Sequence, residues 1–217
     1  MQENQTSLDA LQDIKQMMER SSRFISLSGW SGISAGLAAL AGAFIANSRM
    51  AYYIPSNQQS DYSLRGMAVN QSSYYDLLIE LIAIAIGVFV IAFVTAFFFT
   101  YRRSVSKNTP IWNSVSQRMV WNALLPILVG GIVILRVLYL ESYTLVAPLC
   151  LIFYGLALLN ASKYTLGEIR WLGYAQIVLG LINLWNPGWG LVCWSIGFGV
   201  MHIVYGFIMW WKYERAD

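Results

Sequence analysis

The fold class is decided by residues 77–101, LLIELIAIAIGVFVIAFVTAFFFTY, in which Glu80 is the only charged residue. As an α-helix this stretch rises about 1.5 Å per residue, so it can cross the roughly 30 Å hydrocarbon core of a bilayer with some tilt. Five other segments of the chain are also long and apolar. The segments predicted to span a membrane are residues 24–46, 77–101, 119–140, 144–161, 170–185 and 189–211.

The composition of the whole chain agrees with this interpretation. Hydrophobic residues make up 57% of the 217 residues and charged residues 12%, whereas a soluble domain has roughly 25% charged residues. The mean hydropathy is +0.52. We therefore expect an all-α polytopic membrane bundle of six transmembrane helices, arranged as three antiparallel hairpins. This domain would cover residues 24–211, between an N-terminal cytoplasmic amphipathic helix at 1–23 and a cytoplasmic tail at 212–217.

The basic residues predict the orientation of the bundle. All but three of the 14 lysines and arginines lie before the first span, after the sixth, or in the connections that would share their side of the membrane. The exceptions are Arg49, Arg65 and Arg136, and the loop 47–76 is the only long connection on that other side. Excess Lys and Arg in short loops marks the cytoplasmic face. The pattern thus predicts a multi-pass membrane protein with both termini cytoplasmic.

Few residues are available for catalysis or for binding a cofactor. His202 is the only histidine, and Cys150 and Cys193 both fall inside apolar segments. A haem held between two helices or a histidine-rich metal centre would need more ligands. The sequence shows no phosphate-binding loop, metalloprotease motif or Ser-His-Asp set. We therefore expect no cofactor, no bound metal and no catalytic residue.

The N-terminal region has the pattern of an amphipathic helix. Leu8, Leu11 and Met18 follow helical spacing, and Thr6 with Asp9 has the form of a capping box. This helix either rests against membrane lipids or docks a cytoplasmic regulator or another membrane protein through residues 7–22. No direct contact with nucleic acid is expected.

Small residues on the first span and on the last two spans predict close helix packing. Gly32 and Gly36 form a GxxxG pattern, with Ser28 one turn earlier. Small residues on one face let helix backbones approach closely in lipid. Such packing can lie inside the bundle or between two copies of the chain, which leaves a homo-oligomer as the alternative. The packing residues expected on the last two spans are Gly180, Gly199 and Gly206.

The last two spans also carry polar residues that are candidates for function. Gln176 and Asn183 share one face of span five, and His202 lies on span six. The tight turn at 186–188 places Gln176 and His202 at nearly the same depth. A polar side chain in hydrocarbon must find a partner, so we expect these two to form a hydrogen bond or to share a water. The histidine either makes a structural bond or senses pH and relays a proton.

Two charged residues are candidates in the outer half of the membrane. Glu80 lies in span two and Arg136 in span three. We expect them to pair across the bundle or to line a wet outer vestibule. The pair would be structural, with charged ends reaching the interface, or would form an entry site for a charged ligand or ion.

Residues 18–29, MERSSRFISLSG, resemble the start of a group of uncharacterised bacterial six-span inner-membrane proteins. Such proteins are often encoded beside a small winged-helix regulator, so the resemblance implies a cytoplasmic partner and no catalytic residue. The glycine-rich hairpins, and the Asn186-Pro187-Gly188 turn above all, also resemble the acid-resistance membrane protein family with its three two-helix repeats.

The combined interpretation, which includes the resemblance, is a non-catalytic integral protein of a bacterial inner membrane that acts as a sensor, regulator or assembly subunit. It would work through helix packing and its cytoplasmic docking helix. The alternative is a small-solute or ion transporter or channel that uses polar groups inside the bundle. A third hypothesis is a membrane enzyme acting on a lipid or a quinone.

Overall fold

The computed structural model describes residues 28–53, 71–107 and 112–215, and within these ranges the chain is helical and contains no strand. The predicted cytoplasmic helix, with its docking segment 7–22, lies outside the described residues. The α-helices are α2 (Gly29–Tyr53), α3 (Gln71–Ser106), α4 (Ser114–Tyr139), α5 (Val146–Ala161), α6 (Glu168–Trp185), α7 (Gly190–Trp194) and α8 (Met201–Tyr213). A π-helical segment, η5 (Ser195–Val200), joins α7 to α8. Single 3-10 turns are η2 (Tyr143–Leu145), η3 (Ser162–Tyr164) and η4 (Pro187–Trp189).

Five helical segments in the described part of the chain are long and apolar enough to cross a membrane. They are Gly29–Tyr53, Tyr75–Ser106, Ser114–Tyr139, Tyr143–Tyr164 and Pro187–Tyr213. The remaining predicted span, α6, is less apolar because it carries Glu168, Arg170, Gln176 and Asn183. The side chains of Gln176 and Asn183 are 0% exposed. The residues on the outer surface of α6 are therefore more apolar on average than the helix as a whole.

Several helices extend beyond the apolar segments that predicted them. α2 continues to Tyr53 and α3 begins at Gln71, so the connection between them is shorter than the predicted loop 47–76. Apolar residues mark the part of a helix that lies in hydrocarbon, but backbone hydrogen bonds continue beyond it. In α4 the start is set by Asn113, whose side chain accepts the backbone N–H of Ser116 at 2.8 Å in a capping box.

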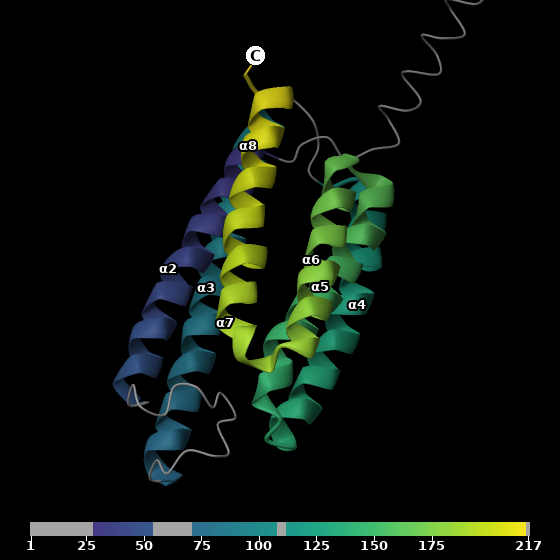
Figure 1. Ribbon diagram of the computed structural model, residues 1–217. Helices are drawn as coiled ribbons and strands as arrows, with labels where there is room; N and C mark the ends of the chain where they lie inside the picture. Colours follow the sequence, from purple (N-terminus) through teal and green to yellow (C-terminus); the bar gives the residue numbers. More distant parts are fainter. Residues whose placement is uncertain (1–27, 54–70, 108–111, 216–217) are drawn as a thin grey trace, which may run out of the picture.

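The helices form a bundle in which α2 and α5 each lie between two neighbours (Figure 1). α2 packs along α3 and α8, whereas α5 packs along α4 and α6. The segment α7–η5–α8 is shared, because α7 contacts α5 and α6 while η5 and α8 contact α2. We expected the last two spans to be neighbours because of their tight turn. They meet near that turn and again at the opposite end through Glu168 and Lys212, but α6 packs mainly on α5 and α8 mainly on α2.

Glycines bring α2 into backbone contact with η5 and α8 along a seam that we call the α2–α8 seam. A β-carbon on Gly36 would lie 2.6 Å from the carbonyl oxygen of Gly199, and one on Gly206 would lie 2.5 Å from that of Gly29. Gly32 lies against the same helix, since its β-carbon would be 3.0 Å from the Cα of Gly206. The first-span glycines thus pack within the chain. Close backbone approach gains dispersion contacts that larger side chains would prevent.

A second glycine seam joins α5 to α6. A β-carbon on Gly155 would lie 2.7 Å from the carbonyl oxygen of Gly173, and one on Gly180 would lie 2.9 Å from that of Pro148. This contact explains why α6 lies along α5 rather than along the whole of the helical segment that follows it. The two seams define which helices are neighbours at the polar site described below.

Gly206→Ala is expected to destabilise the bundle by about 1–3 kcal/mol, the usual cost of overpacking. The new β-carbon would meet the backbone of Gly29, so a whole helix must shift to make room. The measurement is the free energy of unfolding in mixed micelles titrated with dodecyl sulfate. Gly131→Ala on α4 is the control, because nothing lies within 4 Å of its β-carbon position, and alanine favours a helix. Equal losses at the two positions would contradict the α2–α8 seam.

Candidate functional site

Polar side chains from three helices meet in the bundle around the backbone carbonyl oxygen of Gly197. Gln176 of α6 donates its Nε2 to this oxygen at 2.7 Å, and Nδ1 of His202 lies 3.0 Å from it. Because a carbonyl oxygen only accepts, Nδ1 carries the proton. Nε2 of His202 lies 2.8 Å from the hydroxyl of Tyr154 of α5, and a hydroxyl can either donate to this nitrogen or accept from it. Both nitrogens of the imidazole are therefore hydrogen-bonded.

The shared carbonyl lies in the π-helical segment η5. Backbone N–H groups in a π-helix bond to the fifth residue before them, and the N–H of Met201 bonds in this way to the carbonyl of Ile196. Residue 197 must also be small, because a β-carbon there would lie 2.6 Å from Oε1 of Gln176. The polar cluster thus depends on a local departure from α-helical geometry together with a glycine.

Aromatic rings surround the imidazole. The ring of Tyr154 stacks on that of His202 with centroids 5.5 Å apart, and the ring of Phe198 lies 6.0 Å from it. Trp194 packs on Phe198 in turn, with centroids 4.5 Å apart. His202 is 7% exposed. Hydrogen bonds are stronger where water is excluded, so this cluster fixes α5, α6 and α8 relative to one another.

The structure brings Gln176 and His202 together, as their common depth led us to expect. The link between them is the oxygen of Gly197 rather than a direct bond between the side chains. Helical periodicity could not have shown this, because it does not reveal a π-helical segment. Tyr154 was missed, although a tyrosine in the middle of an otherwise apolar helix was a visible signal.

α6 carries two buried amide oxygens that have no hydrogen-bond partner in the described part of the chain. They are Oε1 of Gln176 and Oδ1 of Asn183, and both side chains are 0% exposed. Nδ2 of Asn183 donates to the carbonyl of Asn186 at 3.0 Å, which fixes the direction of its amide. The two residues lie seven apart, so they share a face of the helix about 10 Å apart along its axis. An unpaired acceptor in an apolar interior is costly, and a bound hydrogen-bond donor would satisfy it.

The ion pair that Glu80 forms differs from the predicted one. Glu80 pairs with Arg49, not with Arg136. Both carboxylate oxygens of Glu80 accept from Arg49, each at 2.6 Å, and the hydroxyl of Tyr53 donates to Oε1 at 3.2 Å. The guanidinium of Arg136 instead lies over the ring of Tyr139, 5.1 Å from its centroid. Arg49 is the nearer partner because α2 continues past the predicted end of the first span and packs along α3.

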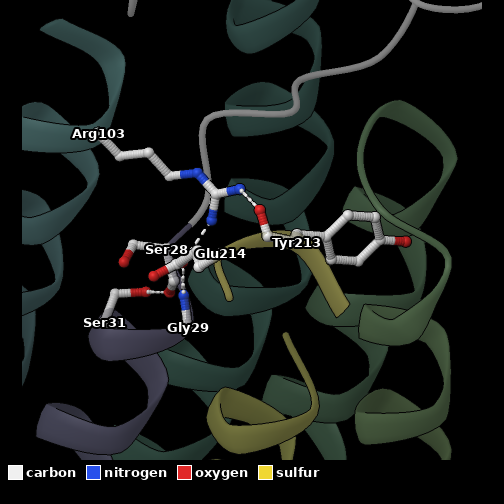
Figure 2. A network of polar contacts seen from close by, with 6 residues as sticks. All are labelled: Ser28, Gly29, Ser31, Arg103, Tyr213 and Glu214. Carbon is white, nitrogen blue, oxygen red and sulfur yellow. Dashed lines mark hydrogen bonds and ion pairs between the residues drawn. The ribbon is translucent and has the colours of Figure 1, made fainter. Parts of the chain in front are cut away.

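At the opposite end of the bundle, Glu214 joins the ends of three helices (Figure 2). We call this the α2–α3–α8 junction. Oε1 of Glu214 accepts the backbone N–H of Gly29, the first residue of α2, at 2.5 Å, and it forms an ion pair with Arg103 of α3. Arg103 also donates to the carbonyl oxygen of Tyr213 at 3.3 Å. The side chains of Arg103 and Glu214 are 10% and 16% exposed, so water and salt screen this pair less than a surface pair.

The start of α2 is well suited to this contact. A carboxylate at a helix N-terminus interacts favourably with the unpaired N–H groups and with the helix dipole. Ser31 donates its hydroxyl to the carbonyl of Ser28 at 2.5 Å (Figure 2). Ser28, predicted as a packing residue, is 5% exposed at this point. The described part of the chain therefore begins at the junction.

A second polar contact at this end joins α6 to α8. Oε1 of Glu168, the first residue of α6, accepts from Nζ of Lys212 at 2.5 Å and from the hydroxyl of Tyr213 at 3.0 Å. Neither Glu168 nor Glu214 was a sequence candidate. Both belong to charged stretches near span ends, which we had used only to orient the bundle.

No family model, curated protein or solved structure matches this chain. The likenesses seen in residues 18–29 and in the turn at 186–188 are not tested by these comparisons.

The hydroxyl of Tyr154 and the ring of His202 are expected to be energetically coupled. In a double-mutant cycle of Tyr154→Phe and His202→Phe, the coupling should be about 1 kcal/mol, within the range of interhelical hydrogen bonds in membranes. The measurement is the free energy of unfolding in micelles. Tyr174→Phe, at a half-exposed tyrosine of α6, is the control and should show no coupling to His202→Phe. Coupling of the same size in both cycles would contradict the direct bond.

Charge reversal distinguishes the observed outer pair from the predicted one. Glu80→Arg alone should lower the midpoint of thermal unfolding, because two guanidinium groups then face each other. Adding Arg49→Glu should restore the midpoint, because the pair is re-formed with its charges exchanged. Adding Arg136→Glu to Glu80→Arg should not restore it. Rescue by Arg136→Glu in place of Arg49→Glu would show that the pair is not the one described.

Proposed function

We propose that this chain is an integral protein of a bacterial inner membrane whose six long helices all cross the bilayer as three antiparallel hairpins. The five long apolar segments support this proposal. We take α6 as the sixth membrane-spanning helix, because its amide side chains are buried and the side chains on its outer face are apolar. The exposed apolar residues of its middle and far end are Val178, Leu181, Ile182, Leu184 and Trp185.

Both termini are proposed to be cytoplasmic. The excess of Lys and Arg in the connections on that side supports this orientation. Arg103 and Lys212 lie at the end of the bundle where α2 begins and α8 ends. Arg49 and Arg136 belong to the opposite end, which would be extracytoplasmic.

Within this membrane we propose a non-catalytic role as a sensor, regulator or assembly subunit. The observation that carries this proposal is the α2–α3–α8 junction. Residues 7–22, the proposed docking segment, lead into α2 at Gly29, whose N–H is held by Glu214. A partner that binds this segment would therefore act on a shielded ion pair shared by three helices. Conversely, a change in the packing of the bundle would alter the position of the docking segment and thereby its binding to the partner.

The polar cluster at Gly197 is in keeping with a structural role inside such a protein. Gln176, His202 and Tyr154 each use a polar group on an interhelical hydrogen bond or on the shared carbonyl. Polar groups in lipid commonly serve to hold helices together. The cluster would keep α5 and α6 in register with α8 while the cytoplasmic end responds to a partner.

One observation favours a second function, the transport of a small cationic or hydrogen-bond-donating solute. The unpaired oxygens of Gln176 and Asn183 lie on one face of α6, and both would accept from such a solute. A transport path would also have to connect this face to the two ends of the bundle.

The docking role is tested by crosslinking in native membranes. A photoreactive amino acid at Leu11 should capture one cytoplasmic protein, which is identified by mass spectrometry. A second photoreactive amino acid placed in the C-terminal tail should capture this protein too, and deletion of residues 1–20 should abolish that capture. Glu214→Gln should change the yield at Leu11 severalfold, because it neutralises the carboxylate that holds α2. Glu141→Gln, an exposed glutamate between α4 and η2, is the matched control.

A yield that is the same with Glu214→Gln as with Glu141→Gln would remove the junction from the proposal. Absence of any captured protein would remove the docking role itself. If vesicles containing the purified protein instead accumulate a solute, and Asn183→Leu abolishes that uptake, the second function replaces the first.

A further inference from the structure

The surface of α8 carries a hollow near its C-terminal end, which we call the α8 groove. It has a volume of about 460 Å³ and is lined by Phe207, Ile208, Trp211 and Lys212. The three apolar side chains are each about half exposed. The hollow is open on one side, and its walls are almost wholly apolar.

The cations of this region lie at one end of the α8 groove. Phe207 comes first along α8, and Arg215 lies in the turn that follows the end of the helix at Tyr213. Arg215 is exposed, and its guanidinium lies over the ring of Trp211, 4.1 Å from the centroid. The apolar wall is thus followed by positive charge at the end of the bundle proposed to face the cytoplasm.

Among the described residues, the carboxylates near the groove leave a net positive charge there. Glu214 is held by Arg103 and by the N–H of Gly29. Glu168 pairs with Lys212, whose side chain nevertheless remains 57% exposed. Arg215 has no ion pair with a carboxylate in the described part of the chain. The guanidinium of Arg215, which has no ion pair among the described residues, and the partly exposed ammonium of Lys212 therefore lie at one end of the apolar groove.

We propose that the α8 groove binds one anionic phospholipid, with an acyl chain along Phe207, Ile208 and Trp211 and the phosphate against Arg215 and Lys212. The order of apolar wall and cation along α8 matches the order of acyl chain and phosphate in a lipid. Basic pockets at the cytoplasmic ends of transmembrane helices commonly bind anionic headgroups. The proposal rests on the membrane location proposed above and adds a specific lipid site to it.

Native mass spectrometry of the full chain released from nanodiscs tests this site. The discs contain equal amounts of phosphatidylglycerol and phosphatidylcholine, and the mass of the retained lipid identifies it. The wild-type chain should retain one phosphatidylglycerol in preference. Arg215→Gln should lower that preference about fivefold, the effect of one basic residue at a membrane surface. Ile208→Trp should lower retention of both lipids, because a larger side chain fills the groove.

Two matched variants keep the interpretation specific. Arg118→Gln removes an exposed cation of α4, and Ile86→Trp enlarges an exposed apolar residue of α3. Neither should change lipid retention. Equal retention of the two lipids by the wild-type chain, or losses as large in the controls as at Arg215 and Ile208, would overturn the α8 groove proposal alone. Failure of the chain to enter nanodiscs at all would overturn the membrane location as well.

Discussion

Direct contact between helix backbones determines the arrangement of this bundle. Two apolar helices in lipid gain little from burying apolar surface against each other, so dispersion contacts and hydrogen bonds must hold them together. Glycines at the α2–α8 seam and at the contact between α5 and α6 supply the close approach. The segment α7–η5–α8 touches both groups of helices. The polar cluster at Gly197 forms where α5 and α6 meet this shared segment.

The sequence predicted the helices well because the physical signal for them is strong. A run such as residues 77–101 has no stable form in water, and the glycines of the first and last spans marked faces that do pack closely. The neighbours of each helix were harder to predict. The tight turn at 186–188 suggested that α6 and α8 would be partners, whereas the glycines place α8 mainly on α2. Short connections restrict which helices can meet, but side-chain size along the helices decides where they remain in contact.

The polar sites were predicted only in part, and the reasons are local. Gln176 and His202 were brought together by common depth, but their shared acceptor is a backbone atom in a π-helical segment, which no side-chain pattern encodes. Glu80 was assigned the wrong arginine because the first helix was ended too early, and this placed Arg49 in a loop. The junction at Glu214 was not foreseen, because it joins residues more than 100 positions apart, beyond the reach of any periodicity.

The α2–α3–α8 junction and the α2–α8 seam together have a consequence for biosynthesis. The first described helix finds one of its two neighbours in the last helix, so the face with Gly32 and Gly36 has no protein partner until translation of the chain is almost complete. During that interval α2 would expose a narrow backbone groove to lipid or to the insertion machinery. A chain that stops short of residue 199 would keep the groove open permanently. Quality-control proteases of the membrane would then be able to distinguish truncated chains from finished ones by that open face.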